Sequence, residues 1–283
     1  MRRAAALLLL GLIACSGGSA VVSTPPPAPP VQDSLEAPYA FALYGDCRGG
    51  HSVHRMIVEQ LAKADIRYIV QTGDLVKKGT EADQWEEFRE ITAEIRKTVP
   101  YHPAKGNHDR GEENKYFEKE FGLEATNYTL HKGPVDLFFL DTNRLNDEQI
   151  EWLEKAVAES KAAHKIAIFH HPCYTLVRKR VAEAAFYRDQ LHDRFVKWGF
   201  CAVFNGHDHN FYTAERDGVR YVATGGGGAP LYEQDPELAQ EGDLYDRIYH
   251  YLLVDVEAKA MRAQVYSIEG HKMPALAFDL CRH

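Results

Sequence analysis

Residues 104–111, AKGNHDRG, directly follow an apolar segment, residues 99–103, which predicts a β-strand. Glycines on both sides of the polar run predict a turn at this point. Asn107, His108 and Asp109 are therefore expected just beyond the end of a strand. In open α/β sheets, ligands bind at the carboxyl ends of the strands, so this stretch indicates a binding site.

Four further stretches repeat this arrangement. Strands are predicted at residues 40–44, 68–71, 165–169 and 201–204, and the polar residues that follow them are Asp46, Asp74, His170 with His171, and His207 with His209. One such residue alone is typical of a turn or a helix cap. The series Gly-Asp, Gly-Asn-His-Asp, His-His-Pro and Gly-His-x-His instead predicts a metal site at one edge of a sheet.

The rest of the chain predicts an α/β fold with a strand-rich final third. Further strands are expected at residues 136–140, 221–223, 251–256 and 262–266. Helices are expected at residues 53–63, 81–97, 112–121, 147–162 and 182–198. No internal repeat interrupts this order.

The first residues are typical of an export signal. Residues 1–14 combine two arginines with an apolar run that is too short for a good membrane-spanning helix. The run ends in Leu-Ile-Ala-Cys15, which resembles a bacterial lipoprotein cleavage box, and the alternative is an ordinary signal peptide. Residues 15–37 are rich in Gly, Ser and Pro and suit a tether. We therefore expect a lipid anchor on Cys15, a folded domain at 38–283, and a periplasmic or cell-surface location.

Charge and cysteine content limit the partners. Without residues 1–14 the chain keeps 31 basic and 41 acidic residues, a formal charge of −10, so no nucleic acid polymer is expected as a partner. Four cysteines follow Cys15 and allow three disulfide connectivities. The sequence cannot choose among them, and Cys47 and Cys173, which adjoin the polar motifs, are the pair to test first.

Taken together, the five motifs resemble those of the calcineurin-like metallophosphoesterases, in particular the branch of the purple acid phosphatases. The resemblance covers nearly the whole chain from residue 38. It implies a four-layer α/β/β/α sandwich, in which two mixed β-sheets pack face to face, and a dinuclear metal site at one edge. The family's ligand types suit Mn, Fe or Zn, as divalent or trivalent ions.

The resemblance also implies a role for each motif residue. Asp74 would bridge the two metal ions, and His108 would protonate the leaving oxygen. The remaining ligands would be Asp46 and His209 for the first ion, and Asn107, His170 and His207 for the second. His171 would lie in the second shell or in the substrate pocket.

Two positions depart from the family pattern. Relatives place a histidine where this chain has Arg48, and purple acid phosphatases place a tyrosine where it has Lys77. Arg48 could hold a phosphate through its fork of donors. The alternative is a structural ion pair with a nearby carboxylate.

Several polar residues near the motifs are expected to have no part in the chemistry. Asp109, Asp208 and His131 are interpreted as solvated turn residues, and His51 and His54 as surface histidines. The glycine run at residues 225–228 lacks the Lys-Ser/Thr ending of a phosphate-binding loop. It is expected to let the backbone pass close to the metals.

The sequence thus predicts a metal-dependent hydrolase of small phosphate esters, with phosphomonoesters favoured. Attack by a metal-bound hydroxide is the mechanism that the resemblance implies. A phosphodiesterase acting on small nucleotides is the nearest alternative. A lipoprotein that binds phosphate or metal without turnover is the alternative from a different class, and His108 argues against it because capture needs no proton donor.

Overall fold

The computed structural model describes residues 35–111, 113 and 115–282. The predicted export signal, Cys15 and most of the tether lie outside the described residues. Five α-helices are assigned in the described part of the chain, namely α1 (His51–Leu61), α2 (Ala82–Thr92), α3 (Tyr116–Phe121), α4 (Asp147–Glu159) and α5 (Val181–Lys197). None of the described helices has the length and apolar character needed to cross a membrane.

The strands form two mixed sheets. The six-stranded sheet has the order β13 (Phe278–Arg282), β12 (Ala260–Ser267), β11 (His250–Val256), β1 (Tyr39–Tyr44), β2 (Ile69–Gln71), β3 (Tyr101–Pro103). The seven-stranded sheet has the order β10 (Leu244–Asp246), β8 (Phe211–Arg216), β9 (Val219–Thr224), β7 (Ala202–Asn205), β6 (His164–Ile168), β5 (Val135–Phe139), β4 (Tyr128–Lys132). Within them, β1, β2 and β3 run parallel, and so do β5, β6 and β7.

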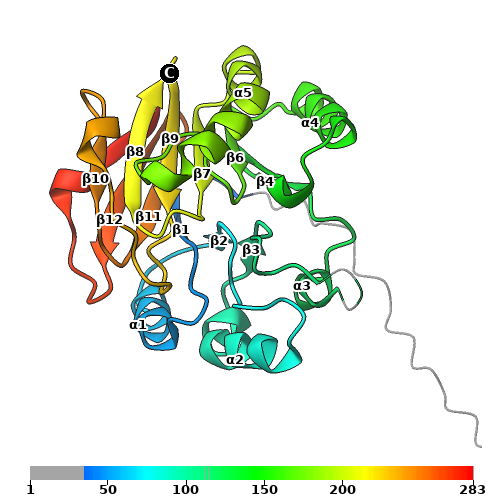
Figure 1. The fold of residues 1–283 in the computed structure, drawn as a ribbon. Coiled ribbons are helices and arrows are strands. Elements are labelled where there is room, and N and C mark those ends of the chain that lie inside the picture. The colour runs from blue at the N-terminus through cyan, green and yellow to red at the C-terminus, as the bar shows by residue number, and fades with distance from the viewer. Residues whose placement is uncertain (1–34, 112, 114, 283) are drawn as a thin grey trace, which may run out of the picture. The chain divides into compact units, whose positions relative to one another are not determined.

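The alternation of side chains along β1 shows how the layers form. Phe41 and Leu43 enter a core that also contains residues of β5, β6 and β7, so the two sheets pack face to face. Ala42 and Tyr44 point the other way, into a core shared with α1 and α2. On the far side, β5, β6 and β7 share a third core with α4 and α5. This order confirms the four-layer α/β/β/α sandwich (Figure 1).

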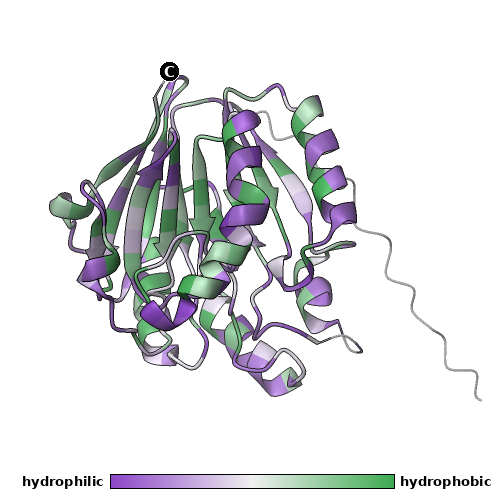
Figure 2. Cartoon of the chain, turned by 45° about the horizontal axis from the view of Figure 1, so that its top comes forward, coloured by the Kyte–Doolittle hydropathy of each residue, from purple (hydrophilic) through white to green (hydrophobic). Residues whose placement is uncertain are grey.

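The outer helices follow their sequence pattern. In α4, Leu153 and Val157 are buried four residues apart, and the Asn146 side chain caps the helix by accepting the Gln149 N–H. Figure 2 shows hydrophilic and hydrophobic residues alternating along such helices. The predicted helix at 81–97 is shorter than expected, because α2 ends at Thr92 and a separate 3₁₀ turn, Ile95–Lys97, follows.

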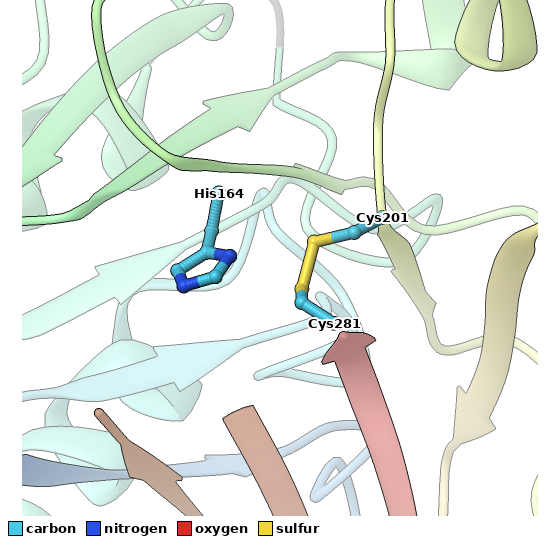
Figure 3. A group of neighbouring side chains, drawn as sticks. All are labelled: His164, Cys201 and Cys281. Atoms are coloured by element: carbon cyan, nitrogen blue, oxygen red, sulfur yellow. A yellow bond between two sulfur atoms is a disulfide. The ribbon is translucent and has the colours of Figure 1, made fainter. Parts of the chain in front are cut away.

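The disulfide is not the pair of cysteines that adjoins the motifs. Cys47 and Cys173 are both buried free thiols, whereas Cys201 is bonded to Cys281 (Figure 3). Cys201 immediately precedes β7 of one sheet, and Cys281 belongs to β13 of the other, so the bond joins the two sheets. His164 lies beside the bond, but disulfide sulfurs are not thiolate ligands, and this group is not a metal site.

Candidate functional site

All five predicted motifs meet where the two sheets adjoin. Asp46, Asp74 and Asn107 follow β1, β2 and β3 of one sheet, whereas His170 and His207 follow β6 and β7 of the other. Contacts between side chains of both sheets join the loops. The site is therefore built across two sheets, because parallel strands of each sheet present their carboxyl ends at the same place.

One group of atoms gathers around His170, which is fully buried. Its Nδ1 lies 2.9 Å from the Thr72 carbonyl oxygen, which can only accept, so Nδ1 carries the ring proton and Nε2 presents a lone pair. Nε2 lies 3.3 Å from Asp74 Oδ1 and 3.1 Å from Asn107 Oδ1. We call the atoms around His170 Nε2 the second site.

His207 completes the second site. Its Nδ1 lies 3.1 Å from His170 Nε2, and its Nε2 lies 3.1 Å from Glu183 Oε2. Since the carboxylate of Glu183 accepts the Nε2–H, Nδ1 is the nitrogen with the lone pair. A carboxylate on the outer nitrogen of a histidine is a frequent support for a metal ligand.

The spacing of these atoms fits a metal ion. Ligands about 2.1 Å from a common ion stand roughly 3.0 Å apart at octahedral angles and roughly 3.4 Å apart at tetrahedral angles. His170 Nε2 is 3.1 to 3.3 Å from the other three atoms. Because four lone-pair atoms face one another, a cation is what the arrangement requires.

The electrostatics agree with that requirement. Burial by itself lowers the pKa of His170, but the carboxylates of Asp74 and Asp46 raise it to about 9. In Asp74, burial raises the pKa, but the charge and hydrogen bond of His170 bring it well below its usual value. The group therefore attracts positive charge to His170 Nε2, whether as a proton or as a metal ion.

A second set of atoms, which we call the first site, lies around Asp46 and His209. His209 Nδ1 lies 2.8 Å from the Pro230 carbonyl oxygen, so its Nε2 carries the lone pair and faces Asp46 Oδ1 at 3.4 Å. Arg48 reaches into this set. Its Nε donates to Asp74 Oδ2 at 2.9 Å, and its Nη2 lies 3.4 Å from His209 Nε2.

Backbone strain is concentrated at these residues. Asp46, Asp74 and His207 have φ angles of 58°, 56° and 69°, in the left-handed region that side-chain-bearing residues seldom adopt. Each costs of the order of 1–3 kcal/mol and persists only where the surroundings enforce it. Here the Asp46 N–H donates to the Gly73 carbonyl, and the His207 N–H donates to the Asp46 carboxylate.

Asp109 holds the loops together, and its interpretation as a solvated turn residue was wrong. The residue is fully buried, and its carboxylate accepts the backbone N–H groups of Gly106, Asp74, Leu75 and Val76. The signal was present in the sequence, because a carboxylate can satisfy several backbone donors of a tight turn. Gly106 is required here, since a Cβ would lie 2.2 Å from Asp74 Oδ1.

His108 lies at the edge of the site and is partly exposed. Its backbone N–H donates to Asp74 Oδ1 at 2.9 Å, which places it beside the Asp74 carboxylate. Its Nδ1 lies 2.8 Å from the Lys77 carbonyl oxygen, so Nδ1 is a donor and Nε2 is the nitrogen that remains for a substrate.

His171 is buried behind the second site. Its Nδ1 lies 2.8 Å from Thr142 Oγ1, its ring stacks on Tyr187, and its centroid is 4.5 Å from that of His207. Burial, followed by the charge of His170, lowers the pKa of His171 to about 3, so the ring is neutral. With Glu183 and His207 it forms a further group of possible ligand atoms.

Other polar residues were missed or wrongly interpreted. Asp208 is buried rather than solvated, and it accepts a hydrogen bond from Thr175 and pairs with Arg180. Tyr232 stacks on His209 with ring centroids 4.1 Å apart. Glu183 comes from a helix without a motif, and Tyr232 follows the glycine run but was not singled out there.

Burial and hydrogen-bond partners show the roles of His51, His54 and His131. His54 is buried and bonds to the Tyr44 hydroxyl, so its interpretation as a surface residue was wrong. His51 is half-exposed and pairs with Glu87, and His131 is exposed and pairs with Asp136. The glycine run lies close to Asp46, since a Cβ on Gly225 would lie 2.9 Å from Asp46 Oδ2.

Similarity to known proteins agrees with this geometry. The chain is 30% identical over 80 residues to tartrate-resistant acid phosphatase type 5 of Oryctolagus cuniculus, which is 28% of this chain and 24% of that protein. It is 27% identical over 115 residues to a probable glycerophosphodiester phosphodiesterase of Arcobacter nitrofigilis, which is 37% of this chain and 41% of that protein. The chain thus spans less than half the length of these curated relatives.

The fold is similar to that of a solved purple acid phosphatase from yellow lupin, Lupinus luteus. The TM-score is 0.74 at 20% identity, over 88% of this chain and 55% of that one. A family model for calcineurin-like phosphoesterases matches residues 39–211. This match covers more than half of the 283 residues and all five motifs of the site, and the chain therefore belongs to the calcineurin-like phosphoesterase family.

Proposed function

We propose that this chain hydrolyses phosphate esters in a metal-dependent reaction and prefers phosphomonoesters. The observation that carries the proposal is that oxygen and nitrogen ligand atoms of Asp74, Asn107 and His207 lie 3.1 to 3.3 Å from His170 Nε2, with His108 and the Arg48 guanidinium both bonded to Asp74. Membership in the family supports it.

Asp74, Asn107, His170 and His207 would hold one metal ion in the second site. Asp46, Asp74 and His209 are the corresponding side chains of the first site. A metal ion bound here would supply positive charge that polarises a phosphoryl oxygen and acidifies the attacking water. The donor set of carboxylate, amide and imidazole suits Mn, Fe or Zn.

His108 is the proposed general acid. In hydrolysis the water oxygen forms a bond to phosphorus, the ester P–O bond breaks, and the leaving oxygen takes a proton. The Lys77 carbonyl fixes the ring of His108 through Nδ1, so Nε2 delivers that proton when the ring is charged. Asp74 lies beside His108 and keeps it next to the reacting phosphate.

Arg48 and His171 are the proposed substrate-side residues. The Arg48 side chain is 14% exposed and contacts Asp74 through Nε, so its charge lies where a phosphate would meet the bridging carboxylate. A dianionic monoester gains more from this charge than a monoanionic diester. His171 would contribute as a neutral ring that supports the second-site side of the pocket.

Export and lipid anchoring remain part of the proposal. The Cys201–Cys281 disulfide supports an oxidising compartment, because structural disulfides are rare in reducing ones. Fractionation of cells with and without a Cys15→Ser change tests the anchor. A variant that stays with the membrane fraction as tightly as the unaltered chain would contradict lipidation at Cys15.

Activity is tested with two esters that share a leaving group, nitrophenyl phosphate and bis(nitrophenyl) phosphate. We expect a higher kcat/KM for the monoester, and loss of both activities in Asp74→Asn or after chelation. Asn tolerates the left-handed backbone of Asp74, so the fold should survive. The exposed Asp189→Asn change is the matched control. Metal binding without turnover of either ester would favour the non-catalytic alternative, and a preference for the diester would favour the phosphodiesterase.

A further inference from the structure

Arg48 contacts the same two side chains that would hold the first metal ion. Its Nε donates to Asp74 Oδ2 at 2.9 Å, and its Nη2 lies 3.4 Å from the bare Nε2 of His209. The Nδ1–H of His209 donates its hydrogen bond to the Pro230 carbonyl, so Nε2 carries no hydrogen and can only accept. The guanidinium therefore satisfies lone pairs that a metal ion would otherwise use.

The two oxygens of Asp74 are divided between different partners. Oδ1 faces His170 Nε2 at 3.3 Å and accepts the His108 N–H, so it belongs to the second site. Oδ2 is bound to Arg48. In this structure the carboxylate links the second site to a guanidinium.

The first site is also poorer in ligands than the second. Its protein atoms are those of Asp46, Asp74 and His209, and the side chain in contact with two of them is Arg48, which has no lone pair to give to a metal ion. Asp46 already accepts the His207 N–H with both carboxylate oxygens. An ion here would have to share Asp46, displace Arg48 from Asp74, and tolerate a permanent positive charge beside it.

We propose that the Arg48 guanidinium takes the place of the first metal ion, and that the chain holds one metal ion tightly, in the second site. The inference rests on the proposed function for the identity of the second site. Arg48 then neutralises Asp74 without a metal and presents a charge to the phosphate. The site is a hybrid of one metal ion and one arginine.

The count of bound metal tests this inference. The full chain is stripped with a chelator and titrated with Mn²⁺, and bound ions per chain are measured by equilibrium dialysis and elemental analysis. We expect one tightly bound ion and the electron paramagnetic resonance spectrum of an isolated Mn²⁺. Two ions about 3.5 to 4 Å apart would instead give a spin-coupled spectrum.

Two variants sharpen the measurement. Arg48→His removes the charge and adds an imidazole, so it should bind a second ion and show the coupled spectrum. Arg55→His adds an imidazole at an exposed position of α1 and should still bind one ion.

The outcomes separate this inference from the proposed function. Two tightly bound, coupled ions in the unaltered chain would overturn the role of Arg48 and leave the phosphoesterase intact. A single ion in a folded Arg48→His protein would also overturn it. Failure of the unaltered chain to bind any ion would reject the second site and, with it, the proposed function.

Discussion

Replacing Asp109 with Asn should weaken both the fold and the metal site. Oδ1 of Asp109 accepts the N–H groups of Leu75 and Val76, and Oδ2 accepts those of Asp74 and Gly106. An asparagine keeps one acceptor oxygen, and its NH₂ group faces two donors. Two buried N–H groups are then left without a partner, at about 1–3 kcal/mol each.

The expected loss of unfolding free energy lies in the lower part of the range that two unpaired N–H groups would give. Burial, and then the charge of Asp74, raises the pKa of Asp109 to about 7, so the change to Asn also removes an unfavourable buried charge. We expect the free energy of unfolding to fall by about 2–3 kcal/mol. Metal affinity should fall by about 10- to 100-fold, because Asp109 sets the position of the Asp74 backbone.

Denaturant unfolding of the metal-free chain and Mn²⁺ dialysis measure the two effects. Asp189→Asn, at an exposed position, is the control and should change the free energy of unfolding by less than about 0.5 kcal/mol. If Asp109→Asn matched this control in both stability and metal affinity, the four hydrogen bonds would not be what organises the loops.

Three further predictions concern His108, Glu183 and the buried His250, whose Nε2 lies 2.9 Å from Thr224 Oγ1. His108→Ala should retain its metal and lose rate by roughly 10²- to 10⁴-fold with alkyl phosphates, and less with nitrophenyl phosphate, which needs no proton donor; steady-state kinetics showing equal losses would exclude the proton-donor role. Glu183→Ala should weaken Mn²⁺ binding by about 10- to 100-fold because the His207 ring loses its acceptor, and unchanged dialysis curves would contradict this. Burial lowers the pKa of His250 to about 4, so between pH 6.5 and 4 the unfolded chain binds a proton that the folded chain does not. The free energy of unfolding should therefore fall by about 3 kcal/mol as the pH falls from 6.5 toward 4. His250→Gln should flatten that part of the curve of unfolding free energy against pH, and an unchanged slope would refute the assignment.

The sequence predicted the strands that carry the site because each is a short apolar run ended by glycine and polar residues. It did not predict β8, which starts immediately after the His-x-His motif. A signal for it was present, since Asp217-Gly218 is a two-residue hairpin turn with both φ angles positive, between β8 and β9. The edge strands β4, β10 and β13 were missed as well, although β4 and β13 each pair with a strand next to them in chain order.

The sequence also could not show which of the two sheets carries each motif. The order strand, turn, helix is the same whether β3 and β6 share a sheet or not, and only the packing of inner faces separates them. Burial of Asp109 and Asp208 was missed for a similar reason, because a polar residue in a turn is buried only when another loop covers it. Sequence reasoning placed Arg48 beside the metal ligands. Its contact with His209 could not be predicted, because the two residues are 161 positions apart and meet only in the folded chain.

The disulfide between the sheets has a consequence for how the chain is made. Cys47, Cys173 and Cys201 all precede Cys281, so they emerge from a ribosome or a membrane pore before the correct partner of Cys201 exists. On the exported route that we propose, an oxidant meets three thiols while 80 residues are still to follow. Burial of Cys47 and Cys173 under α1 and α5 before Cys281 emerges would protect the pairing. Correct disulfide pairing would then depend on the order in which the thiols become buried. A variant whose first half folds slowly should accumulate chains with wrong disulfides.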